Sequence, residues 1–592
     1  MSQSHRPHVY LTSKVLFGLA LLPACLIVLL IWQYSVDVPQ WDQWELVGLF
    51  EKFAKRTLSL SDLFAQQNEY RQFFPNILFV VLGSLTRWDV RYEMVFSFLL
   101  ACLISFNVFK LSTLTIAAGL RQRIWLFLAA NLLIFSASQN ENWLQGQQVI
   151  YFMPVACITT GILIVYSSRF NLSVKFLLCA ALSVVSTFSS ANGLLAWVVL
   201  APVLAWGSPR ESSVPKRWLG FGWLIGFGLS LVLYFYDFKY SPGPFQQVEV
   251  LPTLVRAGLF LLSLLGAPFG VGKLALAAAI GMAQLALFVW MVRRFLQSWS
   301  SPDVRRSMLP WLTLGVYSIV TAVLITFGRL RFGSPLETRY TTFTLYLGVA
   351  IVYLIPLTLS TKQFPIRQYS KHLRLGKLAP LLAVFLVLAQ LPNYFKEVRY
   401  ANVLRLTLLQ GKACLLYGNV VRDECSNPLY PLKDPSRDPS LQSRANVLDQ
   451  LGFLRPQLAR NPLLLDGGSA PAAYGSFVQL EKVRTDEYVA SGWAMLPFRG
   501  EPPAVVLLAY EDADKKTSVF AMAMLETQRD FVSALERRGV YGDNRWRKSF
   551  SARELPHSVK LSAWALDAYT GKVFRIAGTH VLDEGNRSSA RL

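Results

Sequence analysis

The sequence predicts an all-α polytopic membrane domain followed by a mostly β domain. The 592 residues are 53% hydrophobic and only 16% charged, with a formal net charge of +22. Residues 1–397 are about 12% charged and carry a net charge of +17, whereas residues 398–592 are about 24% charged and carry +5. Since soluble domains contain about 25% charged residues, only the second part has a soluble composition. The charge is too sparse for a nucleic-acid-binding protein.

Membrane crossings are predicted from apolar segments, because a spanning helix needs about 20 mostly apolar residues. The clearest crossings are 13–32, 93–117, 149–167, 218–236, 272–292, 308–327, 340–359 and 378–396. Weaker candidates are 122–138, 174–189 and 191–207, and two further segments, 73–86 and 253–267, are short. The first apolar run is too long for a signal peptide and lacks a small-residue cleavage site, so we expect it to remain as an anchor.

Basic residues predict the orientation, since Lys and Arg in short loops mark the cytoplasmic side. They cluster in 110–123, 169–175, 210–217, 293–306 and 362–377. All five clusters can be cytoplasmic only if 73–86 and 253–267 do not cross. This predicts eleven crossings, with the N-terminus inside and the C-terminal domain outside. The alternative of thirteen crossings would place three of these basic loops on the outer face. A bacterial inner membrane with a periplasmic C-terminal domain is the simplest location.

Acidic residues provide an independent check on the eleven-crossing arrangement. Within residues 1–397 it assigns 19 Lys and Arg to the inner side and 13 to the outer side. The acidic residues, which were not used for that assignment, divide into 2 inside and 13 outside. The inner side is therefore predicted to be strongly basic and the outer side to be charge-balanced.

Polar motifs collect in the predicted outer loops. These are Asp37, Trp-Asp-Gln-Trp at 41–44, Asn-Glu-Tyr-Arg at 68–71, Gln-Asn-Glu-Asn-Trp at 139–143, and 328–340 with Arg329, Arg331, Arg339 and Tyr340. Each motif has a simpler interpretation, as solvated loop residues, interfacial tryptophans or anchors to lipid headgroups. Arginines on the outer side are, however, contrary to the usual bias of basic residues toward the cytoplasmic side. One guanidinium group can bind two phosphate oxygens at once. We therefore expect one outer site with an anionic, phosphate-bearing partner.

The acidic residue after the first helix, the long first outer loop and the arginine-bearing late outer loop resemble the GT-C superfamily of membrane glycosyltransferases. The resemblance covers residues 1–397. The motifs at 41–44, 68–71, 139–143 and 328–340 are similar to a bacterial branch that includes a pilin arabinosyltransferase. It implies a sugar donor carried on a polyprenyl phosphate. The acceptor would be an extracytoplasmic protein, such as pilin, or a cell-surface polysaccharide or lipopolysaccharide.

The implied chemistry needs a carboxylate to accept the proton of the acceptor hydroxyl and cations to stabilise the departing phosphate. Asp42 is the candidate base, and a single carboxylate suffices for an inverting displacement. The candidate substrate-binding residues are Asp37, Glu69, Arg71, Asn140, Glu141, Asn142, Arg329, Arg331, Arg339 and Tyr340, with Arg339 foremost for the donor phosphate. No cofactor is predicted, because the outer loops have no D-x-D cluster and the chain has no HExxH motif. A divalent metal at Glu69 or Glu141 is the alternative.

Residues 398–474 are predicted to be a linker-like subdomain with an amphipathic piece at 446–458. A disulfide between Cys414 and Cys425 would suit an oxidising compartment, whereas Cys25, Cys102, Cys157 and Cys179 lie in apolar segments. Residues 475–592 are predicted to form a small β-sandwich. The predicted strands are 487–494, 503–510, 516–523, 557–567 and 572–579, interrupted by a helix-like stretch at 530–538. Trp493, Trp546 and Trp564 belong either to its core or to a sugar-stacking surface.

Three other functions remain open. A transporter or flippase of a lipid-linked sugar would place ionisable residues at mid-membrane and often shows internal repeats, and neither feature is found. A lipid-linked glycan polymerase or ligase would also use outer arginines and a polyprenyl carrier. The third alternative is a membrane scaffold without catalytic activity.

Overall fold

Each of the thirteen predicted membrane segments folds as a helix. The computed structural model describes residues 12–207, 216–239, 250–331, 333–359, 371–421, 441–461, 474–484, 486–497, 499–511, 516–525, 544–556 and 558–582. The long helices are α1 (Ser13–Tyr34), α4 (Phe73–Thr86), α5 (Arg91–Thr115), α6 (Leu120–Ile134), α8 (Val149–Tyr166), α9 (Leu172–Thr187), α10 (Leu195–Gly207), α11 (Lys216–Phe235), α12 (Val250–Gly266), α13 (Leu274–Gln297), α14 (Pro302–Arg329), α15 (Thr341–Leu359) and α16 (Lys371–Tyr417).

Shorter elements connect the long helices. These are η1 (Trp41–Leu46), α2 (Val47–Ala54), α3 (Leu60–Phe64), β1 (Gln66–Gln67), β2 (Tyr70–Arg71), η2 (Ala137–Gln139), α7 (Asn140–Leu144), η3 (Gly146–Gln148), η4 (Ala191–Leu194), η5 (Ala267–Phe269), η6 (Thr338–Tyr340) and α17 (Leu441–Gln450). Within the described residues, eight helical spans are long and apolar enough to cross a membrane, and four further apolar helices are shorter. This architecture is compatible with a multi-pass membrane protein.

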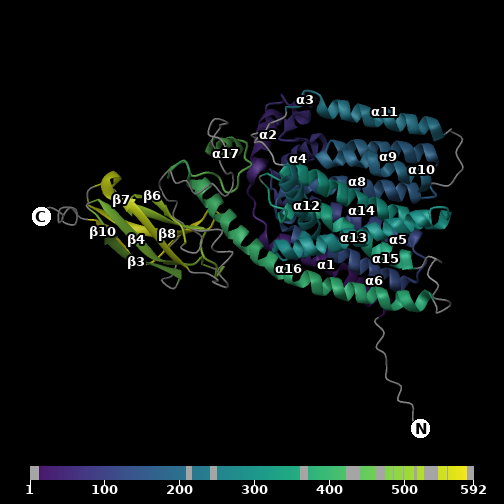
Figure 1. Cartoon of the computed structure of the whole chain (residues 1–592). Coiled ribbons are helices and arrows are strands. Elements are labelled where there is room, and N and C mark those ends of the chain that lie inside the picture. The colour runs from purple at the N-terminus through teal and green to yellow at the C-terminus, as the bar shows by residue number, and fades with distance from the viewer. Residues whose placement is uncertain are drawn as a thin grey trace, which may run out of the picture. The chain divides into compact units, whose positions relative to one another are not determined.

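The chain divides into two compact units. Unit 1 consists of Met1–Gln33, Ser59–Phe79 and Tyr92–Val398, and unit 2 consists of Tyr34–Leu58, Val80–Arg91 and Arg399–Leu592. Figure 1 shows the long helices of unit 1 running side by side and the strands of unit 2 grouped in one β domain. Helix α16 continues past the predicted domain boundary at residue 397. The predicted linker therefore begins as helix, and its amphipathic piece is helical only in α17, which ends at Gln450.

One end of unit 1 gathers the ends of α5, α8, α10 and α13 with the starts of α6, α9 and α14. The Trp311 indole donates a hydrogen bond to the Thr115 hydroxyl (3.1 Å), and the Tyr166 hydroxyl donates one to the Arg306 carbonyl (2.7 Å). The Trp206 and Trp299 rings pack edge to face at 5.2 Å. We call this the basic end, because it carries Lys110, Arg121, Arg123, Arg169, Lys175, Arg293, Arg294, Arg305 and Arg306, with Asp303 as an acidic neighbour.

The other end of unit 1 gathers the hairpin β1–β2, the end of α11, the turn after α12 and the loop between α14 and α15. The Phe74 amide donates to the Phe188 carbonyl (3.3 Å), and the Asn393 amide donates to the Pro268 carbonyl (2.7 Å). We call this the mixed end, because it carries Glu69, Arg71, Glu141, Arg329, Glu337, Arg339, Lys396 and Glu397. The end of α11 and the end of α12 both lie here.

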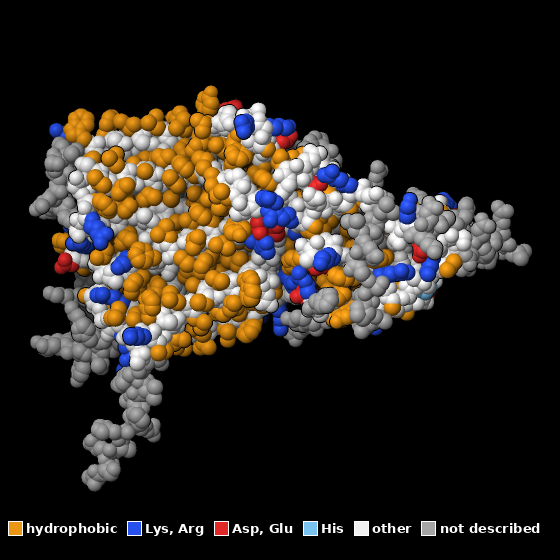
Figure 2. All heavy atoms as spheres, turned by 180° about the vertical axis from the view of Figure 1, so that it is seen from behind, with side chains coloured by type: hydrophobic (Ala, Val, Ile, Leu, Met, Phe, Trp, Pro, Cys, Tyr) orange, Lys and Arg blue, Asp and Glu red, His pale blue; other side chains and the backbone are white. Residues whose placement is uncertain are grey.

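Apolar side chains cover much of the outside of unit 1, as the orange surface in Figure 2 shows for one face. Leu224 and Val232 on α11 and Leu381 on α16 each expose 66% of their surface. Inside the unit, small residues let helices approach closely. A Cβ on Gly281 of α13 would lie 1.9 Å from the Leu262 carbonyl of α12, so only glycine fits there. Exposed apolar helices with small residues between them are typical of membrane bundles.

The β domain of unit 2 contains two antiparallel sheets. The strands are β3 (Gly475–Lys482), β4 (Glu487–Ala494), β5 (Val505–Glu511), β6 (Thr517–Ala523), β7 (Arg545–Ser551), β8 (Val559–Leu566), β9 (Val573–Arg575) and β10 (His580–Leu582). One sheet has the order β10-β8-β5-β6 with β9 on β8, and the other has the order β3-β4-β7. The predicted strands from 487 to 579 are present within a few residues, whereas β3, β7 and β10 were not predicted. The helix-like stretch at 530–538 lies outside the described residues.

The two sheets share one hydrophobic core. Phe477 and Tyr488 of one sheet and Leu508 and Leu561 of the other belong to the same buried cluster, together with Trp546. Trp546 and Trp564 are 1% and 5% exposed, so their burial favours the core interpretation over sugar stacking. Within unit 2, Arg405 of α16 holds the β domain by hydrogen bonds to Glu501 (2.8 Å) and to the Tyr569 hydroxyl (2.9 Å).

Candidate functional site

The mixed end of unit 1 brings together the motifs at 68–71, 139–143 and 328–340. Arg329 and Glu69 are 260 residues apart in sequence, and their Nη2 and Oε2 atoms lie 2.8 Å apart. Asn142 Nδ2 donates to the main-chain oxygen of Arg339 (2.8 Å). These three motifs, which are far apart in the sequence, therefore lie together in unit 1, and their function as one site stays a prediction.

The hairpin β1–β2 is held in place by Arg71. This side chain is only 5% exposed, and its guanidinium donates to the carbonyls of Tyr234 (2.6 Å), Phe64 (3.1 Å) and Tyr236. The Tyr234 hydroxyl in turn donates to the Glu69 carbonyl (2.9 Å). Arg71 therefore fixes the backbone that presents Glu69, and the predicted role of Arg71 in substrate binding stays a prediction.

Arg339 lies at the centre of the charged groups. Its guanidinium forms an ion pair with Glu337 and lies 3.9 Å from Oε1 of Glu141. It also stacks over the ring of Tyr340, with 5.2 Å from Cζ to the ring centroid. Tyr340 is 4% exposed. Arg339 Nε and the Tyr340 hydroxyl are buried and have no hydrogen-bond partner among the described residues.

Amide and hydroxyl side chains position these charged groups. Asn142 Nδ2 donates to the Thr342 hydroxyl (2.6 Å), which donates to Gln139 Oε1 (2.6 Å). The Thr338 hydroxyl lies 3.1 Å from Asn140 Oδ1 and 3.3 Å from Glu141 Oε2. Because buried polar groups must be satisfied by partners, this network fixes α7 against the start of α15. Asn140 and Asn142 thus position the carboxylates and the main chain of the site by hydrogen bonds.

Burial changes the acidity of Glu141. Desolvation raises the pKa of Glu141 above its ordinary value, while the nearby Arg339 charge and the hydrogen bond from Thr338 oppose the increase. Burial disfavours the charged form of a carboxyl group, and a neighbouring cation favours it. A carboxyl group with a raised pKa can take up and release a proton closer to neutral pH.

The other predicted acids, Asp37 and Asp42, lie in unit 2. Asp42 is exposed on η1, in its first turn. Asp37 is partly buried and accepts a hydrogen bond from the Val90 amide (3.3 Å), and Lys412 Nζ donates to its main-chain oxygen (2.8 Å). Desolvation raises the pKa of Asp37, and the Lys412 charge opposes the increase.

Two further predictions concern single residues. Arg331 is exposed in the turn after α14. Cys414 is buried near the end of α16, whereas Cys425 lies outside the described residues, so the predicted disulfide stays a prediction. Cys25, Cys102, Cys157 and Cys179 are free thiols in helices, as their apolar surroundings indicated.

Sequence reasoning gave no role to Glu337, although it belongs to the motif at 328–340, and it missed Lys396 and Glu397. Glu397 served only to mark the end of the membrane region, although a carboxyl group at the end of an apolar run is itself a signal of a functional or paired residue. The structure buries its side chain to 3% exposure and pairs it with Asn140 Nδ2 (2.6 Å) and Lys396 Nζ (2.9 Å). Glu337 could have been found from its position two residues before Arg339.

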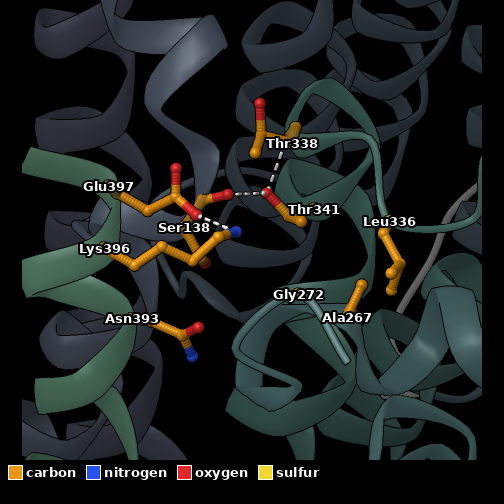
Figure 3. A pocket seen from close by; sticks show the side chains of 9 residues that line it. All are labelled: Ser138, Ala267, Gly272, Leu336, Thr338, Thr341, Asn393, Lys396 and Glu397. Atoms are coloured by element: carbon orange, nitrogen blue, oxygen red, sulfur yellow. Dashed lines mark hydrogen bonds and ion pairs between the residues drawn. The ribbon is translucent and has the colours of Figure 1, made fainter. Parts of the chain in front are cut away.

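A small pocket opens beside Glu397 (Figure 3). Its lining consists of Ser138, Ala267, Gly272, Leu336, Thr338, Thr341, Asn393, Lys396 and Glu397. Among the described residues there is no group of three or more His, Cys, Asp or Glu side chains that could hold a metal ion. That observation does not test whether the predicted reaction needs a metal ion.

Comparison with known proteins gives no relative: no family model, no curated protein and no solved structure matches the chain.

Proposed function

We propose that the chain is a membrane glycosyltransferase that moves a sugar from a polyprenyl-phosphate donor to an extracytoplasmic protein or glycan. The observation that carries the proposal is the pair of buried donors, Arg339 Nε and the Tyr340 hydroxyl, which lack partners among the described residues. Leaving such a group unsatisfied costs about 1–3 kcal/mol. Phosphate oxygens accept hydrogen bonds from both kinds of donor, so a bound phosphate would remove this cost.

Carboxylates balance the positive charge of the proposed phosphate site. Arg339 is already paired with Glu337 and lies near Glu141, and a phosphate would have to replace one of these partners. Glu141 is the more distant of the two partners, 3.9 Å from the Arg339 guanidinium, which makes it the weaker competitor for Arg339. We therefore place the donor phosphate on Arg339 and Tyr340, with Arg329 as an additional cation.

The reaction also needs a base for the acceptor hydroxyl. The acceptor oxygen forms the new bond to the anomeric carbon, the bond to phosphate breaks, and the proton passes to a carboxylate. Asp42 is the candidate from the sequence, and Glu141, which lies 3.9 Å from the Arg339 guanidinium, is the carboxyl group beside the proposed phosphate site. Loss of a general base lowers the rate by about 10²–10⁴-fold.

The contacts in unit 1 support an eleven-crossing arrangement within this proposal. The end of α11 and the turn after α12 lie at the same end of the unit, so α12 need not cross the membrane. The start of α4 also lies at the mixed end, and Phe98 near the start of α5 packs on Phe135 beside the 136–148 loop. Neither short segment is required to cross. The positive-inside bias would place the basic end in the cytoplasm and the mixed end outside.

Mass analysis of cell-surface glycans and surface proteins from a deletion strain tests the proposal. We expect loss of a single sugar, restored by the wild-type gene and not by Asp42→Asn at equal protein level. Asp37→Asn and Glu141→Gln, tested beside it, identify the base. Loss of an entire polymer would instead indicate a polymerase or ligase, and an unchanged glycan profile would reject the transferase.

A further inference from the structure

The two sheets of the β domain differ in their outer faces. In the sheet β10-β8-β5-β6, Leu507 and Trp564 are 0% and 5% exposed, although their neighbours Leu508 and Ala563 are the ones that point into the shared core. The outer face of this sheet is therefore covered. In the sheet β3-β4-β7, outer residues such as Arg547 are exposed, so this sheet has a face that a ligand can reach.

The register of β3, β4 and β7 determines which side chains lie on this outer face. A Cβ on Gly492 would lie 2.8 Å from Cζ2 of Trp546 in the core, so Gly492 faces inward. Since successive residues of a strand point to opposite faces, Trp493 and Ser491 face outward. Two rows of paired outer residues then run across the three strands, Ser476–Trp493–Arg545 and Gln479–Ser491–Arg547. We call these six residues the Trp493 face.

The Trp493 face combines one tryptophan ring with two arginines and polar side chains. Arg545 and Arg547 are exposed and Trp493 is half-buried, so part of its ring is accessible. The face of an aromatic ring carries partial negative charge and attracts the C–H groups of a sugar ring. A guanidinium group binds a carboxylate with two parallel hydrogen bonds, and amide and hydroxyl side chains both donate and accept. Together these groups suit a sugar that carries a carboxylate.

Charge is distributed unevenly over the sheet β3-β4-β7. The six residues of the Trp493 face include two cations and no acidic side chain. The acids Glu481 and Glu487 lie further along β3 and β4, away from the row of Trp493, and Glu487 lies 3.8 Å from Arg484. An anionic ligand is therefore attracted to the end of the sheet that carries Trp493.

Protein occupants fit this face less well than a glycan does. The two rows measure about 10 Å by 7 Å, whereas a stable protein interface buries roughly 800 Å² on each partner around an apolar core. A second copy bound about a two-fold axis would bring the arginines of both copies together, and like charges repel. Basic residues on an edge strand such as β7 also discourage strand pairing, but that role does not account for Trp493 on β4.

We propose that the Trp493 face binds an acidic glycan, with a sugar ring on Trp493, carboxylates on Arg545 and Arg547, and hydroxyl groups on Gln479 and Ser491. The inference goes beyond the proposed function and does not depend on it. The face belongs to unit 2, whereas the residues proposed to hold the donor phosphate belong to unit 1. Where the proposed function also holds, the acidic glycan is the acceptor.

Biolayer interferometry with the purified full chain and biotinylated oligosaccharides tests the proposal. The acidic probes are fragments of polygalacturonate, alginate and hyaluronan, and the neutral control for each probe is its own methyl ester. We expect at least one acidic probe to bind saturably. Its methyl ester should bind at least tenfold more weakly, because the ester has no charge for the arginines to pair with.

Substitutions on the face and matched controls elsewhere locate the binding. Trp493→Ala should weaken it by about tenfold, and Trp493→Phe should retain most of it. Arg545→Gln and Arg547→Gln should each weaken binding of the acidic probe by about tenfold and leave the methyl ester unaffected. The controls are Arg553→Gln, at an exposed arginine just beyond β7, and Trp41→Ala, at an exposed tryptophan of η1. Both should bind as the wild type does.

The outcomes also separate this inference from the proposed function. Absence of saturable binding by every acidic probe, equal affinity for the methyl esters, or equal weakening by Arg553→Gln would overturn the glycan face. A wild-type dimer that Arg547→Glu converts to a monomer in light scattering would show that a second copy occupies the face instead. Glycan binding together with an unchanged glycan profile in the deletion strain would reject the transferase and keep the face, and a missing sugar without glycan binding would do the reverse.

Discussion

The two ends of unit 1 differ in the sign of their charged side chains and in how those side chains are paired. The basic end carries Lys and Arg side chains with Asp303 as an acidic neighbour, whereas the mixed end pairs Arg329 and Arg339 with carboxylates of distant segments. A single sign of charge at a membrane surface follows from orientation alone. At the mixed end, charged and amide side chains lose hydration when they are buried, and their ion pairs and hydrogen bonds must offset that loss of free energy. The basic charges would suit the proposed cytoplasmic orientation, and the paired charges of the mixed end would suit the proposed polar ligand.

Both ends bury donors that lack partners among the described residues, but they differ in number and surroundings. At the mixed end Arg339 Nε and the Tyr340 hydroxyl belong to neighbouring side chains beside Glu337 and Glu141, whereas Arg123 Nε is such a donor at the basic end. Native proteins leave few buried donors without a partner.

Site-directed cysteine labelling tests whether the two ends face opposite sides of the membrane. In cells with permeable outer membranes, a membrane-impermeant maleimide should label Lys239→Cys and Lys273→Cys, which are exposed at the mixed end on either side of α12. Phe170→Cys, exposed near the basic end, should be labelled only after the inner membrane is opened. The effect should be all or none. Labelling of only one of the two lysine positions would show that α12 crosses and would remove the eleven-crossing arrangement.

Binding of a polyprenyl phosphate should distinguish Arg339 from the basic residues at the opposite end. Arg339→Gln should weaken binding by roughly 10–100-fold, the equivalent of about 1.5–3 kcal/mol for hydrogen bonds to a charged group. Glu141→Gln should tighten binding, because it removes a carboxylate that competes for Arg339. Both are measured by native mass spectrometry or intrinsic tryptophan fluorescence.

The control for this measurement is Arg169→Gln, an exposed arginine near the basic end, which should bind as the wild type does. Equal affinity of Arg339→Gln and the wild type would remove Arg339 from the phosphate site. Equal weakening by Arg169→Gln would mean that net charge alone governs binding.

The pH dependence of stability should show the smallest effect. The pKa of Glu141 is raised in the folded state, so the folded protein holds this proton more tightly than the unfolded chain does. The resulting stabilisation is present at low pH and is lost as pH rises through the folded-state pKa. Glu141→Gln stays neutral, so its Tm should exceed that of the wild type by a margin that grows from pH 4 to pH 8.

The control for the pH measurement is Glu51→Gln, which removes an exposed carboxylate paired with Lys55. Its Tm difference from the wild type should stay nearly constant over the same range, since an exposed ion pair contributes about 0–1 kcal/mol. A difference for Glu141→Gln that does not change with pH would contradict the raised pKa.

Much of the fold could be predicted from the sequence, and the missed strands show the limit. Most apolar helices were located within a few residues, because the length of an apolar run is a local property; α16 is the exception, since it continues to Tyr417 beyond the predicted segment 378–396. Strand β7 was missed because Arg545, Arg547 and Lys548 make it look like a loop, although its Trp546 is buried in the core. Strand β10 has only three residues and is defined by its pairing with β8.

The candidate site could be predicted in part. Outer arginines and carboxylates were identified from the positive-inside bias, and the structure brings Glu69 to Arg329 and Glu141 toward Arg339. The role of Arg71 could not be predicted, because its partners are main-chain carbonyls far away in sequence. Glu397 was overlooked because an isolated carboxyl group at the end of an apolar run gives no sign of its partners.

The sequence by itself determined the helical class, the sign of charge at each end of the bundle and the set of motifs at the mixed end. Each of these depends on composition and on spacing along the chain. Only the tertiary structure decided which charges are paired, which donors are buried without a partner, and that Glu397, Lys396 and Asn393 line one pocket. Burial and hydrogen bonding depend on contacts between segments up to 257 residues apart, as for Asn140 and Glu397, and such contacts exist only after the helices have packed.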